Sequence, residues 1–193
     1  MILGLTGGIG CGKTTAARIL AEQGFELIDS DAIIRTEILE DPKIVDLIRS
    51  HFGDGVTDAS GAIDRQRLAQ CVFADGEGLR WLEDLVHPRL FEYWRKAFAD
   101  APGRSWIVEV PLLFEKSLQN WFDFTICVAS HPSVQLARLE QRGLPPSLAR
   151  QRISKQLPLT QKIKLADFVL LNDGSSGFLR AQAGALVNSL STL

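Results

Sequence analysis

Eight residues near the start of the chain, Gly7–Thr14, constrain its fold more than any other feature of the sequence. They have the spacing of a P-loop, G-x-x-x-x-G-K-[ST], in which glycines let successive backbone N–H groups surround an anion. Lys13 is placed to reach the phosphates of a nucleotide, and the Thr14 hydroxyl is placed to bind Mg²⁺. An apolar run over Ile2–Thr6 precedes the loop, and a helix-compatible segment from Thr14 to Gln23 follows it. The order of strand, glycine loop and helix predicts a phosphate-binding α/β fold, and an ordinary glycine-rich turn is the weaker alternative.

The composition limits the class of protein and its partners. The chain has 193 residues, of which 46% are hydrophobic and 23% charged, as expected for one globular α/β domain with a small insertion. A net charge of −2 argues against a general nucleic-acid binder. The three cysteines, Cys11, Cys71 and Cys127, are far apart, which favours free thiols in a reducing compartment over disulfides or zinc. The first strand starts at Met1, leaving no room for a signal peptide, and no apolar run approaches about 18 residues, so we expect a cytoplasmic protein without a membrane partner.

Five apolar runs predict a parallel sheet covered by helices on both faces. The predicted strands are Ile2–Thr6, Glu26–Ile28, Trp106–Val110, Phe124–Val128 and Phe168–Leu171. The long segment between the second and third runs is helical in pattern and exceeds what one connecting helix requires. The predicted helices in it are Pro42–Phe52, Arg65–Phe73 and Leu79–Phe98.

These patterns predict one domain made of three parts. A helical insertion would cover residues 32–103, and a helical lid would cover residues 133–156. The lid would break at Gly143–Pro146, with Ser147 as the N-cap of its second helix. The remaining segments, 1–31, 104–132 and 157–193, would form the core, whose ligands should bind at the carboxyl ends of the strands.

Acidic side chains follow two of the predicted strands. Asp29 and Asp31 come after the second strand, and a spacing of two residues in extended chain aims both carboxylates the same way. One of them could accept a proton from an attacking hydroxyl while the other positions Mg²⁺ through water. A helix N-cap is the alternative for Asp31. Glu109 ends the third strand and resembles the second acidic element of P-loop proteins, which acts on Mg²⁺ through water.

Further candidates lie in the lid and beside the P-loop. Arg138 and Arg142 are four residues apart, so their guanidinium groups could close on ATP phosphates; a solvated helix face is the alternative. Asn172 begins an Asn-Asp-Gly sequence that is typical of a turn, although it could also lie against an adenine ring. Cys11 lies in the anion-binding loop before a helix, a setting that favours its thiolate, so ATP should slow its alkylation.

The segment after Glu109 contains Leu112, Leu113 and Phe114, which are either ordinary core residues or the floor for an apolar part of a substrate. His87 precedes Pro88 in the predicted insertion and is expected at a helix end or as a buried hydrogen-bonding group. No Ser or Cys nucleophile pattern surrounds His87, so a hydrolase triad is not supported.

Blocks in order along nearly the whole chain resemble the dephospho-CoA kinase family. They are Gly4–Thr15, Ile28–Asp31 with Arg35, Gly61–Arg65 with Leu68 and Phe73, His87-Pro88, Val110–Glu115, the lid pattern from Gln135 to Gln156, and Lys162 to Gly174. The P-loop is shared by many families, whereas the Val110–Glu115 block and the Lys162–Asn172 block are more particular. Two residues depart from the family pattern, since Cys11 stands where Ser or Ala is usual and Glu109 where Asp is common.

The resemblance implies a P-loop kinase-like parallel five-stranded sheet and transfer of the ATP γ-phosphoryl group to the ribose 3′-hydroxyl of dephospho-CoA, with Mg²⁺ as cofactor. It implies Asp31 as catalytic base, with Lys13, Arg138 and Arg142 also acting in catalysis. The implied ATP-binding residues are Gly8, Gly10, Cys11, Gly12, Lys13, Thr14, Thr15, Arg138 and Asn172. The implied acceptor-binding residues are Asp31, Arg35, Arg65, His87, Leu112, Leu113 and Phe114. Thr14 would bind Mg²⁺, Asp29 and Glu109 would act on it through water, and a monomer is the default state.

Two other functions compete with this one. A shikimate-type kinase would share the small P-loop core, but a compact polyol acceptor does not call for an insertion of this length. A GTP-dependent switch would need the guanine motif N-K-x-D, and none of the three asparagines, Asn120, Asn172 and Asn188, is followed by Lys.

Overall fold

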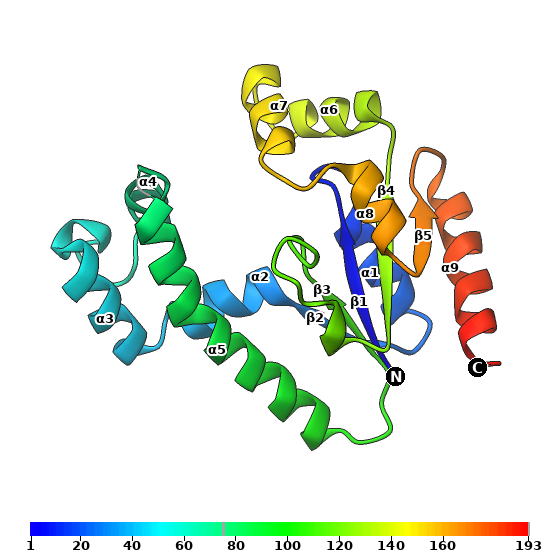
Figure 1. The fold of residues 1–193 in the computed structure, drawn as a ribbon, viewed down its shortest axis with the longest axis horizontal. Coiled ribbons are helices and arrows are strands. Elements are labelled where there is room, and N and C mark those ends of the chain that lie inside the picture. Colours follow the sequence, from blue (N-terminus) through cyan, green and yellow to red (C-terminus); the bar gives the residue numbers. More distant parts are fainter. Residues whose placement is uncertain (75, 193) are drawn as a thin grey trace. The chain divides into compact units, whose positions relative to one another are not determined.

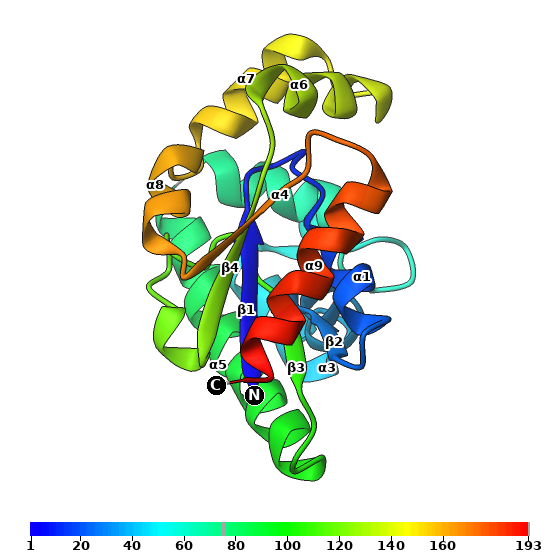
Figure 2. The ribbon, with the colours of Figure 1, turned by 90° about the vertical axis from the view of Figure 1, so that its right-hand side faces the viewer.

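The computed structural model describes residues 1–74 and 76–192. The chain divides into two compact units, both drawn as ribbons in Figures 1 and 2. The core unit comprises Met1–Asp29 and Gly103–Leu193, and the helical unit comprises Ser30–Pro102. The chain therefore leaves the core unit after its second strand and returns to it before the third.

The core unit is built on a parallel sheet of five strands in the order β2-β3-β1-β4-β5. The strands are β1 Ile2–Gly7, β2 Glu26–Asp29, β3 Trp106–Glu109, β4 Phe124–Ala129 and β5 Phe168–Leu171. The register places Leu5 beside Glu109 and Glu109 beside Asp29, so both acids lie at the carboxyl edge of the sheet. The predicted α/β class and parallel sheet are confirmed.

Helices cover both faces of this sheet because the central strands are apolar on both sides. Figure 2 shows α9 (Ser176–Leu190) in front of the strands, next to α1 (Lys13–Ala21). Leu3 and Leu5 of β1 are fully buried in the cluster that these two helices complete. Gly4 lies between them and meets Phe122 and Leu113 instead. The helix α8 (Leu159–Leu165) packs on β1 and β4.

Between β4 and α8 the chain forms α6 (Pro132–Gln141) and α7 (Pro146–Ser154). The predicted break between them is confirmed, but Ser147 is not an N-cap. Pro145 is the N-cap and Pro146 is the first helical residue, because the fixed φ of proline suits that position and the missing N–H costs nothing there. A short 3₁₀ helix, Gln119–Trp121, precedes β4.

A side chain bonds the last residue of the sheet edge at β5. Gln182 of α9 accepts a hydrogen bond from the Leu171 backbone N–H at 2.9 Å and donates one to the Leu171 carbonyl at 2.8 Å. The last residue of the edge strand therefore has both of these backbone groups bonded within the core unit.

Among the residues described, the regular structure of the helical unit is helical apart from an isolated antiparallel β-bridge between Thr57 and Ile63. Its helices are α2 Ser30–Ile33, a π-helix Ile34–Ile38, α3 Pro42–Phe52, a 3₁₀ helix Asp54–Val56, α4 Arg65–Ala74 and α5 Gly76–Asp100. The predicted α3 is correct at both ends, because Asp41 caps it by accepting a hydrogen bond from the Lys43 N–H at 2.8 Å and Pro42 begins it. Within this unit α4 packs on α5.

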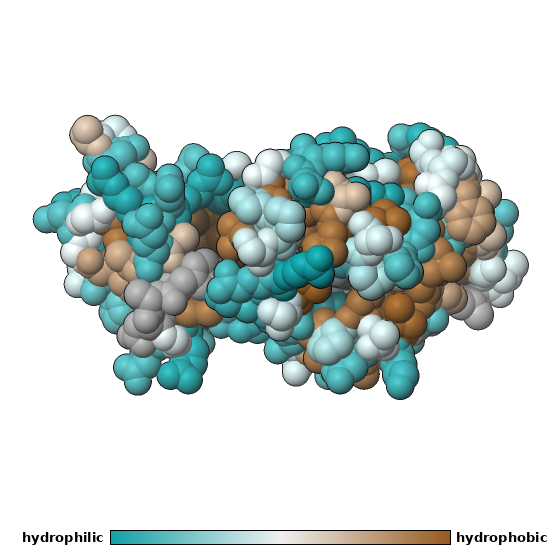
Figure 3. Space-filling model, turned by 90° about the horizontal axis from the view of Figure 1, so that it is seen from above, coloured by the Kyte–Doolittle hydropathy of each residue, from teal (hydrophilic) through white to brown (hydrophobic). Residues whose placement is uncertain are grey.

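The surface mixes polar and apolar residues. Figure 3 shows hydrophobic patches between hydrophilic ones on the face it presents, without a continuous band of either kind. None of the helices in the described ranges is long and apolar enough to cross a membrane.

Gly4→Ala is expected to destabilise the protein, because the added Cβ would lie 2.5 Å from Cδ2 of the Phe122 ring and 2.8 Å from Cδ1 of Leu113. Overpacking of this kind costs about 1–3 kcal/mol. Gly184→Ala in α9 is the matched control, since no atom lies within 4 Å of its added Cβ and alanine suits a helix better by about 1 kcal/mol. Urea unfolding measures both changes, and equal midpoints for Gly4→Ala and the wild type would contradict the packing argument.

Candidate active site

The P-loop is shaped by its close neighbours as well as by its glycines. Gly10 and Gly12 have φ values of 80° and 87°, in the region that favours glycine. A Cβ on Gly10 would lie 2.9 Å from the backbone oxygen of Gln135, and one on Gly12 would lie 2.2 Å from Nδ2 of Asn172. Helix α6 and the segment after β5 thus approach the loop so closely that larger residues are excluded.

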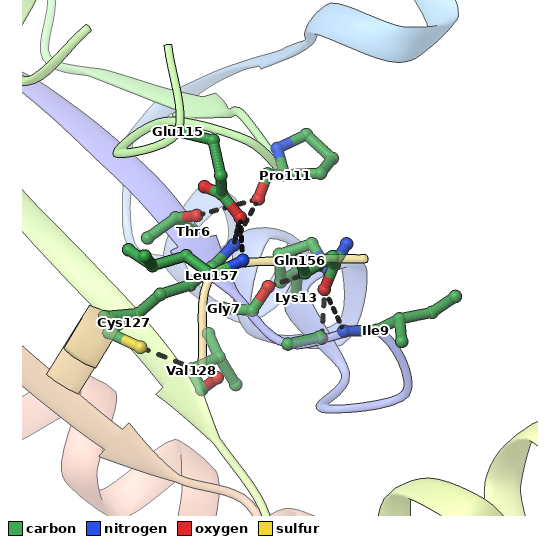
Figure 4. Close-up of polar contacts among 12 residues, drawn as sticks. Thr6, Gly7, Ile9, Lys13, Pro111, Glu115, Cys127, Val128, Gln156 and Leu157 are labelled. Atoms are coloured by element: carbon green, nitrogen blue, oxygen red, sulfur yellow. Dashed lines mark hydrogen bonds and ion pairs between the residues drawn. The ribbon is translucent and has the colours of Figure 1, made fainter. Parts of the chain in front are cut away.

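Lys13 begins α1 directly after the loop. Its Nζ donates to the carbonyls of Gly7 at 3.3 Å and Gly8 at 3.2 Å, and Figure 4 shows the side chain folded along the loop. Gly12 is the N-cap of α1 and no side chain caps this end of the helix, where the helix dipole is positive. A loop lysine and an uncapped helix N-terminus together form a setting suited to phosphate.

A hydroxyl and two carboxylates meet at the carboxyl edge of the sheet. The Thr14 hydroxyl donates to Oε1 of Glu109 at 3.2 Å, and Asp29 is the register partner of Glu109 on the neighbouring strand. Glu109 is only 6% exposed, so its carboxylate is held in place. These hard oxygen donors suit Mg²⁺, which keeps several waters and phosphate oxygens as further ligands. Within the described residues no cluster of three or more His, Cys, Asp or Glu offers an all-protein metal cage.

Arg138 of α6 ties the P-loop to two other segments. Its Nη1 donates to the carbonyls of Gly10 and Cys11, both at 3.4 Å, and to the Ser130 hydroxyl at 3.2 Å. Its Nη2 donates to the carbonyl of Asn172 at 2.8 Å. The solvated-face alternative is therefore wrong for Arg138. Arg142 differs, since it is exposed and forms the C-cap of α6.

Asn172 follows β5 and is 7% exposed. Its side-chain Nδ2 donates to the Cys11 carbonyl at 2.8 Å, so the amide holds the loop backbone. Its own carbonyl accepts from the Ser130 hydroxyl at 2.9 Å as well as from Arg138. The first residue of the Asn-Asp-Gly segment thus holds the P-loop backbone by a hydrogen bond to the Cys11 carbonyl.

Ser130 and Gln135 complete this support, and motif reasoning from the residues alone gave neither a role. The Gln135 side chain is buried and donates from Nε2 to the Ser130 carbonyl at 2.9 Å. Oε1 of Gln135 lies 2.9 Å from the position of a Cβ on Gly8. Gln135 lies three residues after the first residue of α6, and no local sequence pattern predicts its contacts. The residue itself was part of the family pattern of the lid.

The dephospho-CoA kinase family profile matches residues 1–177 of the chain. A dephospho-CoA kinase of Thermosynechococcus vestitus is 40% identical over 175 residues, which cover 90% of this chain and 86% of that protein. The chain belongs to the dephospho-CoA kinase family. Its activity is that of an ATP-dependent kinase that phosphorylates dephospho-CoA to coenzyme A.

Two solved structures are similar to the whole fold of this dephospho-CoA kinase. One, from Thermus thermophilus, is 32% identical with a TM-score of 0.87 and covers 100% of this chain and 97% of that one. The other, a dephospho-CoA kinase from Campylobacter jejuni, is 27% identical with a TM-score of 0.73 and covers 99% of this chain and 97% of that one. The family assignment rules out the shikimate-type kinase and the GTP-dependent switch as the function.

The loop after β3 divides the three apolar residues expected to face the acceptor. Leu113 is fully buried and packs at Gly4, which fits the alternative that it is a core residue. Leu112 is 36% exposed and Phe114 is half-buried. Only these two of the three present surface to a ligand.

Four of the predicted acceptor residues of this kinase lie in the helical unit. Asp31 is exposed in the first turn of α2, which begins at Ser30, so the N-cap alternative is wrong. Since Asp29 ends a strand and Asp31 is helical, the argument from extended chain fails too. His87 lies inside α5, not at a helix end, with its ring stacked on Phe91 at 5.9 Å. The remaining two, Arg35 and Arg65, are exposed.

The expectation that the loop favours the Cys11 thiolate is contradicted by the burial of this residue and the raised pKa of its thiol. Cys11 has no exposed surface, and burial raises the pKa of its thiol, although backbone N–H groups, Lys13 and Arg138 act in the opposite direction. Burial also raises the pKa of the Cys127 thiol to about 12. Desolvation outweighs the positive charges because the sulfur lies inside the core cluster.

Iodoacetamide should label Cys71 well before Cys11 and Cys127 in the folded kinase, because Cys71 is exposed and the other two are buried. Peptide mass spectrometry after a short incubation at about pH 8 measures the order of labelling. Labelling in urea is the control, since all three thiols should then react alike. Equal native labelling of Cys11 and Cys71 would contradict the burial argument.

Arg138→Ala should lower kcat/KM for ATP by at least about 10–100-fold, because a single charge-assisted hydrogen bond contributes about 1.5–3 kcal/mol and the variant loses four such contacts, two of them long at 3.4 Å. Arg138→Lys should not restore activity, since one ammonium group cannot replace the two guanidinium nitrogens that donate in different directions. Steady-state kinetics with varied ATP measures this. Full recovery in Arg138→Lys would mean that charge alone matters at this position.

Proposed function

We propose that this kinase transfers the γ-phosphoryl group of ATP to the ribose 3′-hydroxyl of dephospho-CoA, with the ATP phosphates on the P-loop. The support for this is the loop backbone, which Arg138 and Asn172 hold by hydrogen bonds to its carbonyls, together with the loop lysine Lys13 and the uncapped N-terminus of α1. A loop already fixed in place loses little entropy when phosphates bind. The proposed ATP-binding residues are Gly8, Gly10, Cys11, Gly12, Lys13, Thr14, Thr15, Arg138 and Asn172.

We propose further that Mg²⁺ is held by the Thr14 hydroxyl, with Glu109 and Asp29 acting through water. This proposal is supported by the hydrogen bond between Thr14 and Glu109 and by the register pairing of Glu109 with Asp29. When bound, the ion neutralises charge on the phosphate oxygens. Glutamate in place of aspartate lengthens the arm by one methylene, and the Thr14 contact shows that this arm reaches the P-loop threonine.

Asp31 is the proposed base that accepts the proton of the 3′-hydroxyl. It follows the end of β2 by two residues, and that strand ends next to Glu109. Dephospho-CoA carries a diphosphate and a long arm, which match exposed arginines and apolar side chains. The proposed acceptor residues are Asp31, Arg35, Arg65, His87, Leu112 and Phe114.

The proposed division of the chain assigns ATP to a core of residues 1–31, 104–132 and 157–193. The acceptor is assigned to the insertion 32–103, and residues 133–156, which include Arg142, act as a lid. We also propose that the protein is cytoplasmic, because free cysteines suit a reducing compartment. A monomer is its proposed state.

The acceptor assignment predicts that dephospho-CoA with ATP and Mg²⁺ gives coenzyme A, and that shikimate gives no product. Adenosine should be a far poorer acceptor in kcat/KM, since it lacks the diphosphate and arm whose binding energy aligns the ribose. Mass spectrometry of the products measures all three, and fragmentation locates the new phosphate. A phosphate on another hydroxyl would overturn the 3′ assignment.

Asp31→Asn should lower kcat by about 10²- to 10⁴-fold with little change in ATP binding, as expected when a general base is lost. Asp100→Asn, at the end of α5, is a matched control because Asp100 is exposed and outside the proposed site. Kinetics and nucleotide titration separate the two effects. Parallel losses of folding and ATP binding in Asp31→Asn would make Asp31 a structural residue.

A further inference from the structure

A lysine lies completely buried in the core unit, in α8. Lys162 has no exposed surface, and its Nζ makes an ion pair with Oε1 of Glu115 at 2.8 Å. The same Nζ donates to the carbonyl of Pro111, also at 2.8 Å. A charge this deep is tolerated only with such partners. None of the roles proposed above uses it.

Both partners of Lys162 make a second contact, as Figure 4 shows. Oε1 of Glu115 accepts a hydrogen bond from the backbone N–H of Leu157 at 2.9 Å. The Pro111 carbonyl accepts one from the hydroxyl of Thr6, in β1, at 3.2 Å. One buried ammonium group therefore joins β1, the loop after β3, the chain leaving α7, and α8.

The chain leaving α7 also holds the P-loop. Gln156, next to Leu157, accepts with Oε1 a hydrogen bond from the backbone N–H of Ile9 at 3.0 Å. Ile9 lies between Gly8 and Gly10, in the most glycine-rich part of the loop. Two consecutive residues thus attach this segment to Glu115 on one side and to the phosphate loop on the other.

We propose that Lys162, Glu115 and Gln156 are positioning residues for phosphoryl transfer. The buried ion pair fixes the backbone at Leu157, and Gln156 in turn fixes the Ile9 amide and hence the loop around the γ-phosphate. This inference rests on the proposed function. Its energetic basis is that a misplacement of about 1 Å in a reacting group can cost about 100-fold in rate.

A purely structural role would give a different result. An ion pair that only stabilised the fold would change the unfolding temperature and leave the kinetics of the folded enzyme alone. A positioning role changes kcat and the mobility of the Ile9 amide in protein that remains folded.

The first test compares Gln156→Ala with Gln161→Ala, which removes an exposed glutamine next to Lys162. Gln156→Ala should lower kcat about tenfold or more, with a smaller change in KM for ATP, because the loop can still bind phosphates but no longer holds them in one geometry. Hydrogen exchange of the Ile9 amide, followed by NMR without ATP, should speed up about tenfold in the same variant. Gln161→Ala should match the wild type in both.

The second test compares Lys162→Met with Lys164→Met, the exposed lysine on the same helix. Methionine is also unbranched, is one atom shorter than lysine and carries no charge, so the Glu115 and Pro111 contacts are lost. Lys162→Met should show the same loss of kcat and faster Ile9 exchange, while Lys164→Met should show neither. Where Lys162→Met does not fold, the Gln156→Ala result decides.

The inference would be overturned if Gln156→Ala had the same kcat and the same Ile9 exchange rate as the wild type and Gln161→Ala. Failure of the wild type to phosphorylate dephospho-CoA would instead overturn the proposed function. The Ile9 exchange rates are measured without acceptor, so they test the positioning of the loop in either case.

Discussion

Arg138 holds together segments that are far apart in the sequence, and the geometry of the phosphate loop depends on it. One guanidinium group donates to two loop carbonyls, to Ser130 after β4 and to Asn172 after β5. These hydrogen bonds join the segments that follow β1, β4 and β5. Helix α6 is brought so close that Gly10 can carry no side chain.

The strands of this fold could be predicted from the sequence, because fully buried parallel strands are short apolar runs that few other elements resemble. The glycine loop, the acid at the end of β3 and the break between α6 and α7 could also be predicted, because each shows in a local pattern of residues. The start of α7 was misplaced by two residues, since Pro145-Pro146 and Ser147 give competing signals for a helix N-terminus.

The contacts behind the loop could not be predicted in this way. The hydrogen bond from Asn172 to the Cys11 carbonyl spans 161 residues of sequence, and no local sequence pattern around either residue predicts it. The same holds for Lys162, because lysine is almost never fully buried and only its distant partners explain its position. Cys11 shows the converse: its neighbours in sequence favour a thiolate, but the core around its sulfur raises the pKa.

The bonded edge of β5 has a consequence for how copies of this protein meet. An exposed edge strand offers unpaired N–H and C=O groups on which another chain can extend the sheet. Gln182 occupies both groups of Leu171 with its own amide, which imitates the next strand in the sheet. A neighbouring molecule that tried to add a strand there would first have to displace this side chain. The amide thus hinders the addition of a strand at this residue of the β5 edge.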